Sequence, residues 1–231
     1  MRPVERGACP VDDEGNPRTF SEYAMARGEL IARIGEYCSF CESRMHASLA
    51  VEHILPKFHH PDLELDWDNF LLACVNCNST KGDQPIDPGD YYWPDRDNTA
   101  RAFAYAADGI VRPAPGLTAA QRKVAQRTIT LTGLDKLPTK NPKASDRRWQ
   151  HRGEAWGRAE RARACLAAHD SESMRRLIVD QATAYGFWSI WMTVFAADMD
   201  MRRRFLTAFV GCPADCFDTN TQPVQRTGGA L

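Results

Sequence analysis

Two cysteine pairs, Cys38-Ser-Phe-Cys41 and Cys74-Val-Asn-Cys77, determine how the middle of this 231-residue chain folds. The gap of two residues within each pair lets both sulfurs face one ion. Four thiolates therefore predict a closed, tetrahedral Zn²⁺ site that is structural, with Cys38, Cys41, Cys74 and Cys77 as its ligands. A thioredoxin-type redox pair is disfavoured, because no βαβ pattern surrounds either pair and redox chemistry has no use for the second.

The segment between the two pairs, and the residues just after it, carry groups suited to hydrolysing phosphodiesters. Residues 49–57 are typical of a short strand that contains Glu52 and His53. Asn78 and Lys81 are three residues apart and share a face if a short helix begins at the second pair. Neutral imidazole accepts a proton near pH 7, so His53 is the natural general base. Oxygen atoms of Glu52 and Asn78 suit Mg²⁺ or Mn²⁺ as a catalytic cation.

The order of these motifs carries a family resemblance. "CSFCE…VEHILPK…NFLLACVNCNSTK", over about residues 36–83, resembles the HNH nuclease superfamily with its ββα-metal finger. It is similar in particular to the bacterial HNH proteins that include the nuclease subunit of Septu-type anti-phage systems. The resemblance implies that His53 is the base and that Glu52 and Asn78 bind the cation. It also implies that Asn69 braces the loop and orients the base, while Asn78 stands where the family's final His is expected.

Charge is distributed unevenly, although the whole chain has a formal net charge of only −1. Residues 52–108 are acidic, and residues 122–163 are rich in Lys and Arg, most densely over 140–163. Arginine at this density favours contact with phosphates, with a solvated helix or a protein-docking face as the alternative. The predicted phosphate contacts are Lys57 and Lys81 beside the site, and Arg147, Arg148 and Arg152 in the basic segment.

The whole pattern predicts an α+β protein, a zinc-braced ββα finger embedded in a mainly α-helical body. Helical periodicity covers residues 117–134, 146–169 and 171–210, with Thr118 and Ser171 as N-caps and Gly133 and Gly211 near the ends. We expect a loose N-terminal arm over 1–18 and a nuclease domain over 19–116, with a leading helix and a Pro-rich extension. A helical domain over 117–216, basic at 140–163, and a flexible tail over 217–231 complete the expected organisation.

The sequence predicts a cytoplasmic protein that makes no membrane contact. No basic–apolar–small signal opens the chain. The longest apolar stretch, residues 183–197, is too short to span a bilayer and is typical of a buried helix. Eight cysteines in a chain of this kind indicate metal ligands or free thiols rather than disulfides.

Together these observations predict a metal-dependent endonuclease that hydrolyses DNA. The resemblance further implies the effector of an anti-phage system acting with an ATPase partner. A protein of a different class fits the same motifs, namely a non-catalytic zinc-knuckle module for nucleic-acid binding or assembly. A nuclease that acts on RNA also stays open, since the finger contacts backbone rather than bases.

Overall fold

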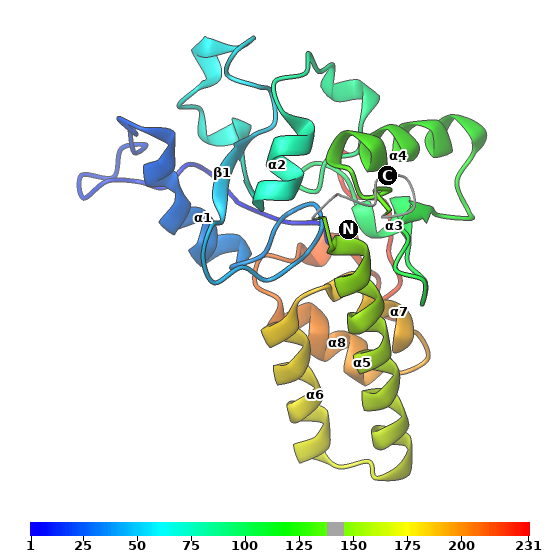
Figure 1. Ribbon diagram of the computed structural model, residues 1–231. Coiled ribbons are helices and arrows are strands. Elements are labelled where there is room, and N and C mark those ends of the chain that lie inside the picture. Colours follow the sequence, from blue (N-terminus) through cyan, green and yellow to red (C-terminus); the bar gives the residue numbers. More distant parts are fainter. Residues whose placement is uncertain (138–145) are drawn as a thin grey trace.

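The computed structural model describes residues 1–137 and 146–231 (Figure 1). The strands are β1 (Ala50–His53), β2 (Phe70–Ala73), β3 (Phe103–Ala104) and β4 (Arg112–Pro113). The helices are α1 (Arg27–Ile34), α2 (Val75–Lys81), α3 (Thr99–Ala102), α4 (Ala119–Thr132), α5 (Arg148–Ala168), α6 (Glu172–Tyr185), α7 (Trp188–Val194) and α8 (Met199–Ala208). Helices dominate and the sheets are small, so the predicted α+β class with a finger inside a helical body is confirmed.

The finger has the predicted order of two strands and a helix. β1 pairs with β2 in antiparallel register, which sets His53 opposite Phe70 and Glu52 opposite Leu71. All four residues of β2 are buried, since the strand packs against β1 and α1. Cys74 then turns the chain into α2, which ends at Gly82 with a positive φ of 56°. The strand and the short helix expected from the motif spacing therefore both form.

The core is formed by two neighbouring clusters of apolar side chains. The first lies around the finger, α1 and α4, with Phe40, Phe70 and Trp93 among its large members. The second lies among α5, α6, α7 and α8 and includes Trp188 and Trp191. α5 and α6 extend side by side away from the finger, with α7 packed against α5 and α8 packed against α6 (Figure 1).

Capping residues place the helix ends where the sequence predicts them. The Thr118 hydroxyl accepts from the Gln121 N–H, and the Gln121 side chain accepts from the Thr118 N–H, forming a capping box for α4. Gly133 ends that helix in the left-handed conformation, with φ 65° and ψ 30°. Ser171 caps α6 by accepting from the Met174 N–H. Gly211 does not act as a C-cap, because α8 ends at Ala208.

The helical stretch predicted over 171–210 is divided into α6, α7 and α8. The first break comes at Gly186, where φ is +84°. A Cβ there would lie only 2.5 Å from the Glu42 carbonyl oxygen, so the chain needs glycine to approach the first cysteine pair. The second break follows Val194, and α8 begins after Asp198, which caps it through the Met201 N–H. The apolar stretch forms the buried α7, shorter than the expected 183–197.

The first four residues and the last residue of the chain pack against the body, whereas residues 11–19 of the expected loose arm are exposed. Met1 and Val4 are in the core, and the Arg2 guanidinium donates to the Ile34 carbonyl at 2.6 Å. At the other end Leu231 is 1% exposed, and Arg226 donates to the Val4 carbonyl at 3.1 Å. Pro and Gly in these segments signal irregular backbone, and irregular backbone packs well when buried arginines satisfy its carbonyls.

Among residues 1–137 and 146–231, no helix combines the length and the apolarity needed to cross a membrane.

Candidate metal centre and catalytic site

The four cysteines of the two pairs meet in one buried cluster. Their sulfur atoms all lie within 4.8 Å of one another, and the Cys41 and Cys74 sulfurs are 3.7 Å apart. A disulfide would bring two sulfurs to about 2.05 Å. Four sulfurs placed about 2.3 Å from a central Zn²⁺ lie about 3.8 Å apart at the corners of a tetrahedron. The donor set therefore fits a structural zinc ion, with all four positions taken by protein thiolates.

Hydrogen bonds to Glu42 join the helical part of the chain to the first cysteine pair. This residue directly follows Cys41, is 3% exposed and has a positive φ of 65°. Its carbonyl accepts from the Phe187 N–H at 2.9 Å, and its carboxylate accepts from the Ser189 N–H at 2.9 Å. The start of α7 is thus capped by a side chain from the metal frame, which joins the two core clusters.

His53 lies at the end of β1, with its ring packed between Tyr23 and Phe70 at centroid distances of 4.9 and 5.3 Å. Its Nε2 is 2.9 Å from the Glu64 carbonyl oxygen. A carbonyl only accepts, so Nε2 carries the proton and Nδ1 is left as the basic nitrogen. Burial lowers the pKa of His53 more than the bond to Glu64 raises it. The imidazole is therefore neutral at pH 7, as a general base must be.

Asn69 closes the loop that holds His53 in this orientation. Its Oδ1 accepts from the Leu55 N–H at 2.7 Å, and its Nδ2 donates to the carbonyls of Leu55 at 2.9 Å and Leu63 at 3.2 Å. The loop between β1 and β2 is thereby pinned at its start and near Glu64, whose carbonyl contacts His53. A side chain with both an acceptor and a two-hydrogen donor is needed for this, which explains asparagine at the position.

Glu52 and Lys81 form a buried ion pair on the opposite face of β1. Lys81 Nζ is 2.8 Å from Glu52 Oε1, and it donates to the His53 carbonyl at 2.6 Å. The two side chains are 4% and 1% exposed. Burial raises the pKa of Glu52, against the lowering effect of Lys81. Lys81 therefore braces the strand, and its predicted contact with phosphate is wrong.

The two predicted cation ligands, Glu52 and Asn78, differ in their surroundings: Glu52 is buried beside Lys81, whereas Asn78 is less buried. Asn78 is half-buried on α2, one turn before Lys81 and hence on the face toward β1. The ion pair with Lys81 uses Oε1 of Glu52, and the hydrogen bonds among the described residues leave its Oε2 unclaimed. A cation at Glu52 would lie beside the Lys81 ammonium, and this like charge would weaken its binding.

The remaining predicted phosphate contacts divide into two exposed and two buried side chains. Lys57 is exposed beside the site, 2.7 Å from Glu64 and over the Tyr23 ring. Arg147 is also exposed and bonds only to Gln150 among the described residues. Two others are buried, which makes their predicted phosphate contact wrong: Arg148 contacts the second cysteine pair, and Arg152 donates to the carbonyls of Gly109 and Leu134.

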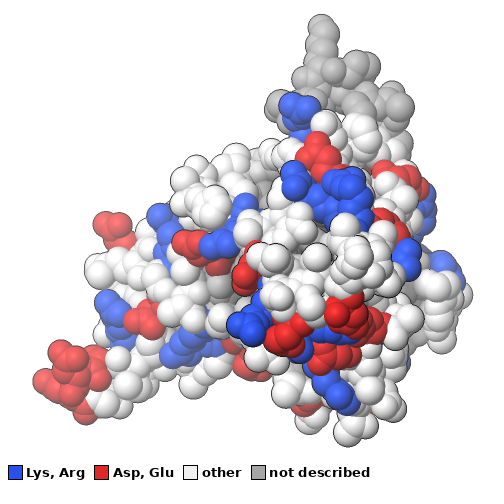
Figure 2. Space-filling view, turned by 90° about the horizontal axis from the view of Figure 1, so that it is seen from below, with Lys and Arg blue, Asp and Glu red and all other residues white. Residues whose placement is uncertain are grey.

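Charges around the free end of α5 and α6 are paired rather than gathered by sign. Viewed from that end, basic and acidic side chains are interspersed across the surface (Figure 2). Arg175 bonds to Asp170, Asp198 and Asp200, and Arg204 bonds to Glu172 and Asp200. This part of the surface is a solvated, mixed-charge face. Lys140 and Lys143 of the predicted basic segment lie outside the described residues.

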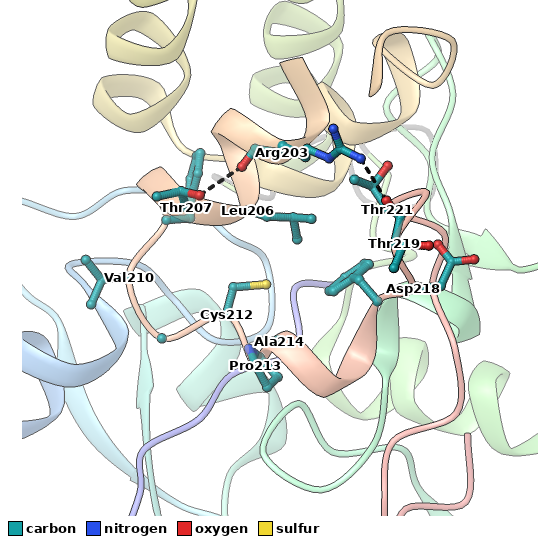
Figure 3. A pocket seen from close by; sticks show the side chains of 13 residues that line it. Arg203, Leu206, Thr207, Val210, Cys212, Pro213, Ala214, Asp218, Thr219 and Thr221 are labelled. Atoms are coloured by element: carbon teal, nitrogen blue, oxygen red, sulfur yellow. Dashed lines mark hydrogen bonds between the residues drawn. The ribbon is translucent and has the colours of Figure 1, made fainter. Parts of the chain in front are cut away.

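A hollow between α8 and residues 211–221 lies apart from the finger (Figure 3). None of the predicted site residues lines it. Its polar side chains bond within the protein, since Arg203 donates to the Thr219 carbonyl at 2.9 Å and Thr207 donates to the Arg203 carbonyl at 3.1 Å.

Sequence reasoning missed the residues that support the site from outside the motif. Tyr23 packs on His53 from the turn before α1, and the Glu64 carbonyl fixes the imidazole tautomer. Glu42 and Arg148 join the cysteine frame to the helical half. A contact to a backbone carbonyl cannot be predicted from residue types. The position of Glu42, directly after the first cysteine pair, was a signal that the sequence did contain.

Comparison with known proteins identifies the same segment. Residues 37–84 match the family model for HNH endonuclease. The chain is also similar to the Septu protein PtuB of Bacillus thuringiensis, with 42% identity over 56 residues. That match covers 23% of this chain and 22% of the relative, so about a fifth of the relative's length is represented. The predicted HNH resemblance is thus confirmed for the finger.

Proposed function

We propose that this chain is a metal-dependent HNH endonuclease that hydrolyses DNA phosphodiester bonds in anti-phage defence. The main support for this proposal is the way in which the imidazole of His53 is oriented and hydrogen-bonded. Its Nε2–H is held on the Glu64 carbonyl by a loop that Asn69 closes, which leaves Nδ1 free to accept a proton. A merely structural histidine has no need for a neutral ring, a fixed tautomer and a braced loop together.

In the proposed reaction, His53 Nδ1 removes a proton from a water molecule that attacks the phosphorus. The bond to the 3′ oxygen breaks, leaving a 5′-phosphate on one product and a 3′-hydroxyl on the other. Glu52 and Asn78 would hold a divalent cation, which would supply positive charge for the leaving oxygen if the strand bends enough to bring Glu52 and His53 to one phosphate. Lys57 is the exposed cation nearest the histidine loop and contacts a neighbouring phosphate. The zinc frame keeps His53, Asn69 and α2 in register.

The pH dependence of cleavage follows from the buried imidazole. The pKa of His53 is lowered from 6.5, so the neutral base predominates at pH 7 and is lost as the pH falls through this lower value. We expect the single-turnover cleavage rate to be level near neutrality and to fall on the acid side with a midpoint below 6.5. The fall in rate on the acid side should also be seen in Glu52→Gln, which shows that it does not come from protonation of the Glu52 carboxylate. A midpoint above pH 7 contradicts the assignment.

The catalytic cation is expected to bind weakly because Lys81 already neutralises Glu52. Glu52→Gln should raise the Mg²⁺ or Mn²⁺ concentration needed for half-maximal cleavage by at least about tenfold, the scale seen even for outer-shell partners of metal ligands. Glu64→Gln is the matched control, since it changes a nearby exposed carboxylate but keeps the carbonyl that holds His53. Metal titrations in which Glu52→Gln overlays the unmodified protein remove Glu52 from the site.

Substrate choice and control are proposed to lie outside the finger. Exposed basic residues are spread over the helical half, among them Arg122, Arg127, Arg147, Arg161 and Arg163. The chain is proposed to act in the cytoplasm with an ATPase partner that controls the nuclease, and similarity to a Septu protein supports a role in a defence system. Such a partner accounts for selectivity that a backbone-reading finger lacks.

Incubating supercoiled plasmid with the purified full chain and Mg²⁺ or Mn²⁺ tests the proposed function. A nuclease converts the plasmid to nicked and linear forms, and His53→Ala does not. Retarded but uncut plasmid supports the alternative of a non-catalytic zinc-knuckle module. If a labelled RNA is cut while the plasmid stays intact, the substrate is RNA instead of DNA.

A further inference from the structure

Arg148, the first residue of α5, uses every N–H of its guanidinium on buried partners. Nη1 donates to the Cys77 sulfur at 2.9 Å and to the Thr132 carbonyl at 2.8 Å. Nη2 donates to the Gly133 carbonyl at 2.9 Å and to Asp146 at 2.6 Å, and Nε donates to Asp146 at 2.9 Å. The side chain is 4% exposed, so all five donors are committed inside the protein.

We propose that Arg148 is a positioning residue for the zinc site, which it stabilises through Cys77 and couples to the helical half. Four thiolates around one Zn²⁺ carry a formal charge of −2, and a buried charge of this kind is costly without compensation. The guanidinium places an N–H donor and the near end of its positive charge at the sulfur itself, while Asp146 pairs with its Nε and Nη2 atoms. The C-terminal carbonyls of α4 and the Asp146 carboxylate hold it in place, favoured by the negative end of the helix dipole.

The coupling extends from the metal ligand to the rest of α2. Lys136, just past α4, donates to the Thr80 hydroxyl at 2.8 Å, so the α4–α5 junction holds α2 at both Cys77 and Thr80. Gly133 permits this close approach, because a Cβ there would lie 2.9 Å from the Thr80 methyl group and 3.0 Å from Arg148 Nη2. The inference concerns zinc retention and stands whether or not the finger cuts DNA.

Zinc transfer from the purified full chain to an excess of a chromogenic chelator tests the role. Arg148→Lys keeps the positive charge but replaces a planar five-donor fork with a compact ammonium. We expect it to release zinc about 10–100-fold faster than the unmodified protein, the range for loss of an outer-shell partner. Arg147→Lys changes the exposed neighbour and should stay within about twofold of the unmodified protein, with the same helix content by circular dichroism.

A second readout separates a bond to the thiolate from a general effect on folding. In protein loaded with Co²⁺, loss of the N–H···S bond raises the energy of the sulfur lone pair. The thiolate-to-cobalt charge-transfer band should therefore move to longer wavelength in Arg148→Lys and not in Arg147→Lys. If Arg148→Lys fails to fold, Asp146→Asn tests the same anchor and should release zinc several-fold faster. Unchanged release and an unchanged band in the folded Arg148→Lys protein, or unchanged release in Asp146→Asn, overturn the proposal.

Discussion

Replacing His53 with alanine is expected to reduce DNA cleavage by about 10²–10⁴-fold, the usual cost of losing a general base. The loss should be confined to catalysis, because the ring contacts Tyr23, Phe70 and the Glu64 carbonyl but none of the zinc ligands. Single-turnover cleavage of a labelled duplex measures the effect. Zinc content and the thermal midpoint of unfolding, measured on the same preparation, show whether the frame is intact.

His59 is the matched control for this substitution. It lies in the same loop and likewise carries its Nε2–H on a carbonyl, that of Asp83 at 2.7 Å, but it is exposed. His59→Ala should therefore leave the cleavage rate within a few-fold of the unmodified protein. If His53→Ala cleaves as fast as the unmodified protein and His59→Ala does not, the general base is His59.

Replacing Cys38 with serine is expected to unfold the finger over residues 37–83. Zinc binding at a thiolate site of this kind contributes on the order of 10 kcal/mol to folding, and losing one of four ligands forfeits most of it. The unsupported segment has only two short strands and a seven-residue helix to hold it. Metal analysis and hydrogen exchange measure the change, with loss of bound zinc and of amide protection across β1, β2 and α2.

Cys165 provides the control, since it is an exposed free thiol on α5, remote from the frame. Cys165→Ser should keep one zinc per chain and the same exchange pattern as the unmodified protein. A Cys38→Ser protein that retains one tightly bound zinc and a protected finger contradicts the four-thiolate site.

The finger was predictable because its information is local. The spacing within each cysteine pair, the strand before Pro56 and the short helix after Cys74 are all set by neighbours in sequence. The gathering of the four sulfurs then follows from the hydrogen bonds between Ser39 and Leu72, which set the first cysteine pair against β2, just before the second pair. The catalytic roles of His53, Glu52, Asn69 and Asn78 stay predictions, although the structure shows contacts that agree with those of His53 and Asn69.

The arginines of α5 were assigned wrongly because charge density says nothing about which helix face is buried. Arg148 and Arg152 are spaced four residues apart and continue a buried stripe through Ala155, Ala159 and Ala162. That stripe was present in the sequence and indicated the inner face. The sequence did not show what these arginines contact on that face, namely the Cys77 sulfur and backbone carbonyls of distant segments.

Lys81 was assigned to phosphate for a similar reason. It follows Cys77 by four residues, so the helix that places a zinc ligand inward also places this lysine inward. Its partner Glu52 comes from β1, and only the folded finger brings the two charges together. The packing of the two chain ends through Arg2 and Arg226 could not be predicted either. The acceptors of these arginines are backbone carbonyls, which every residue has.

The most direct test of this account is the cleavage of a defined DNA duplex by zinc-loaded full chain, with the product ends identified. The account predicts one zinc per chain, no cutting until Mg²⁺ or Mn²⁺ is added, and then products with 5′-phosphate and 3′-hydroxyl ends. A folded chain with its zinc in place that leaves the duplex intact at every Mg²⁺ and Mn²⁺ concentration contradicts the account.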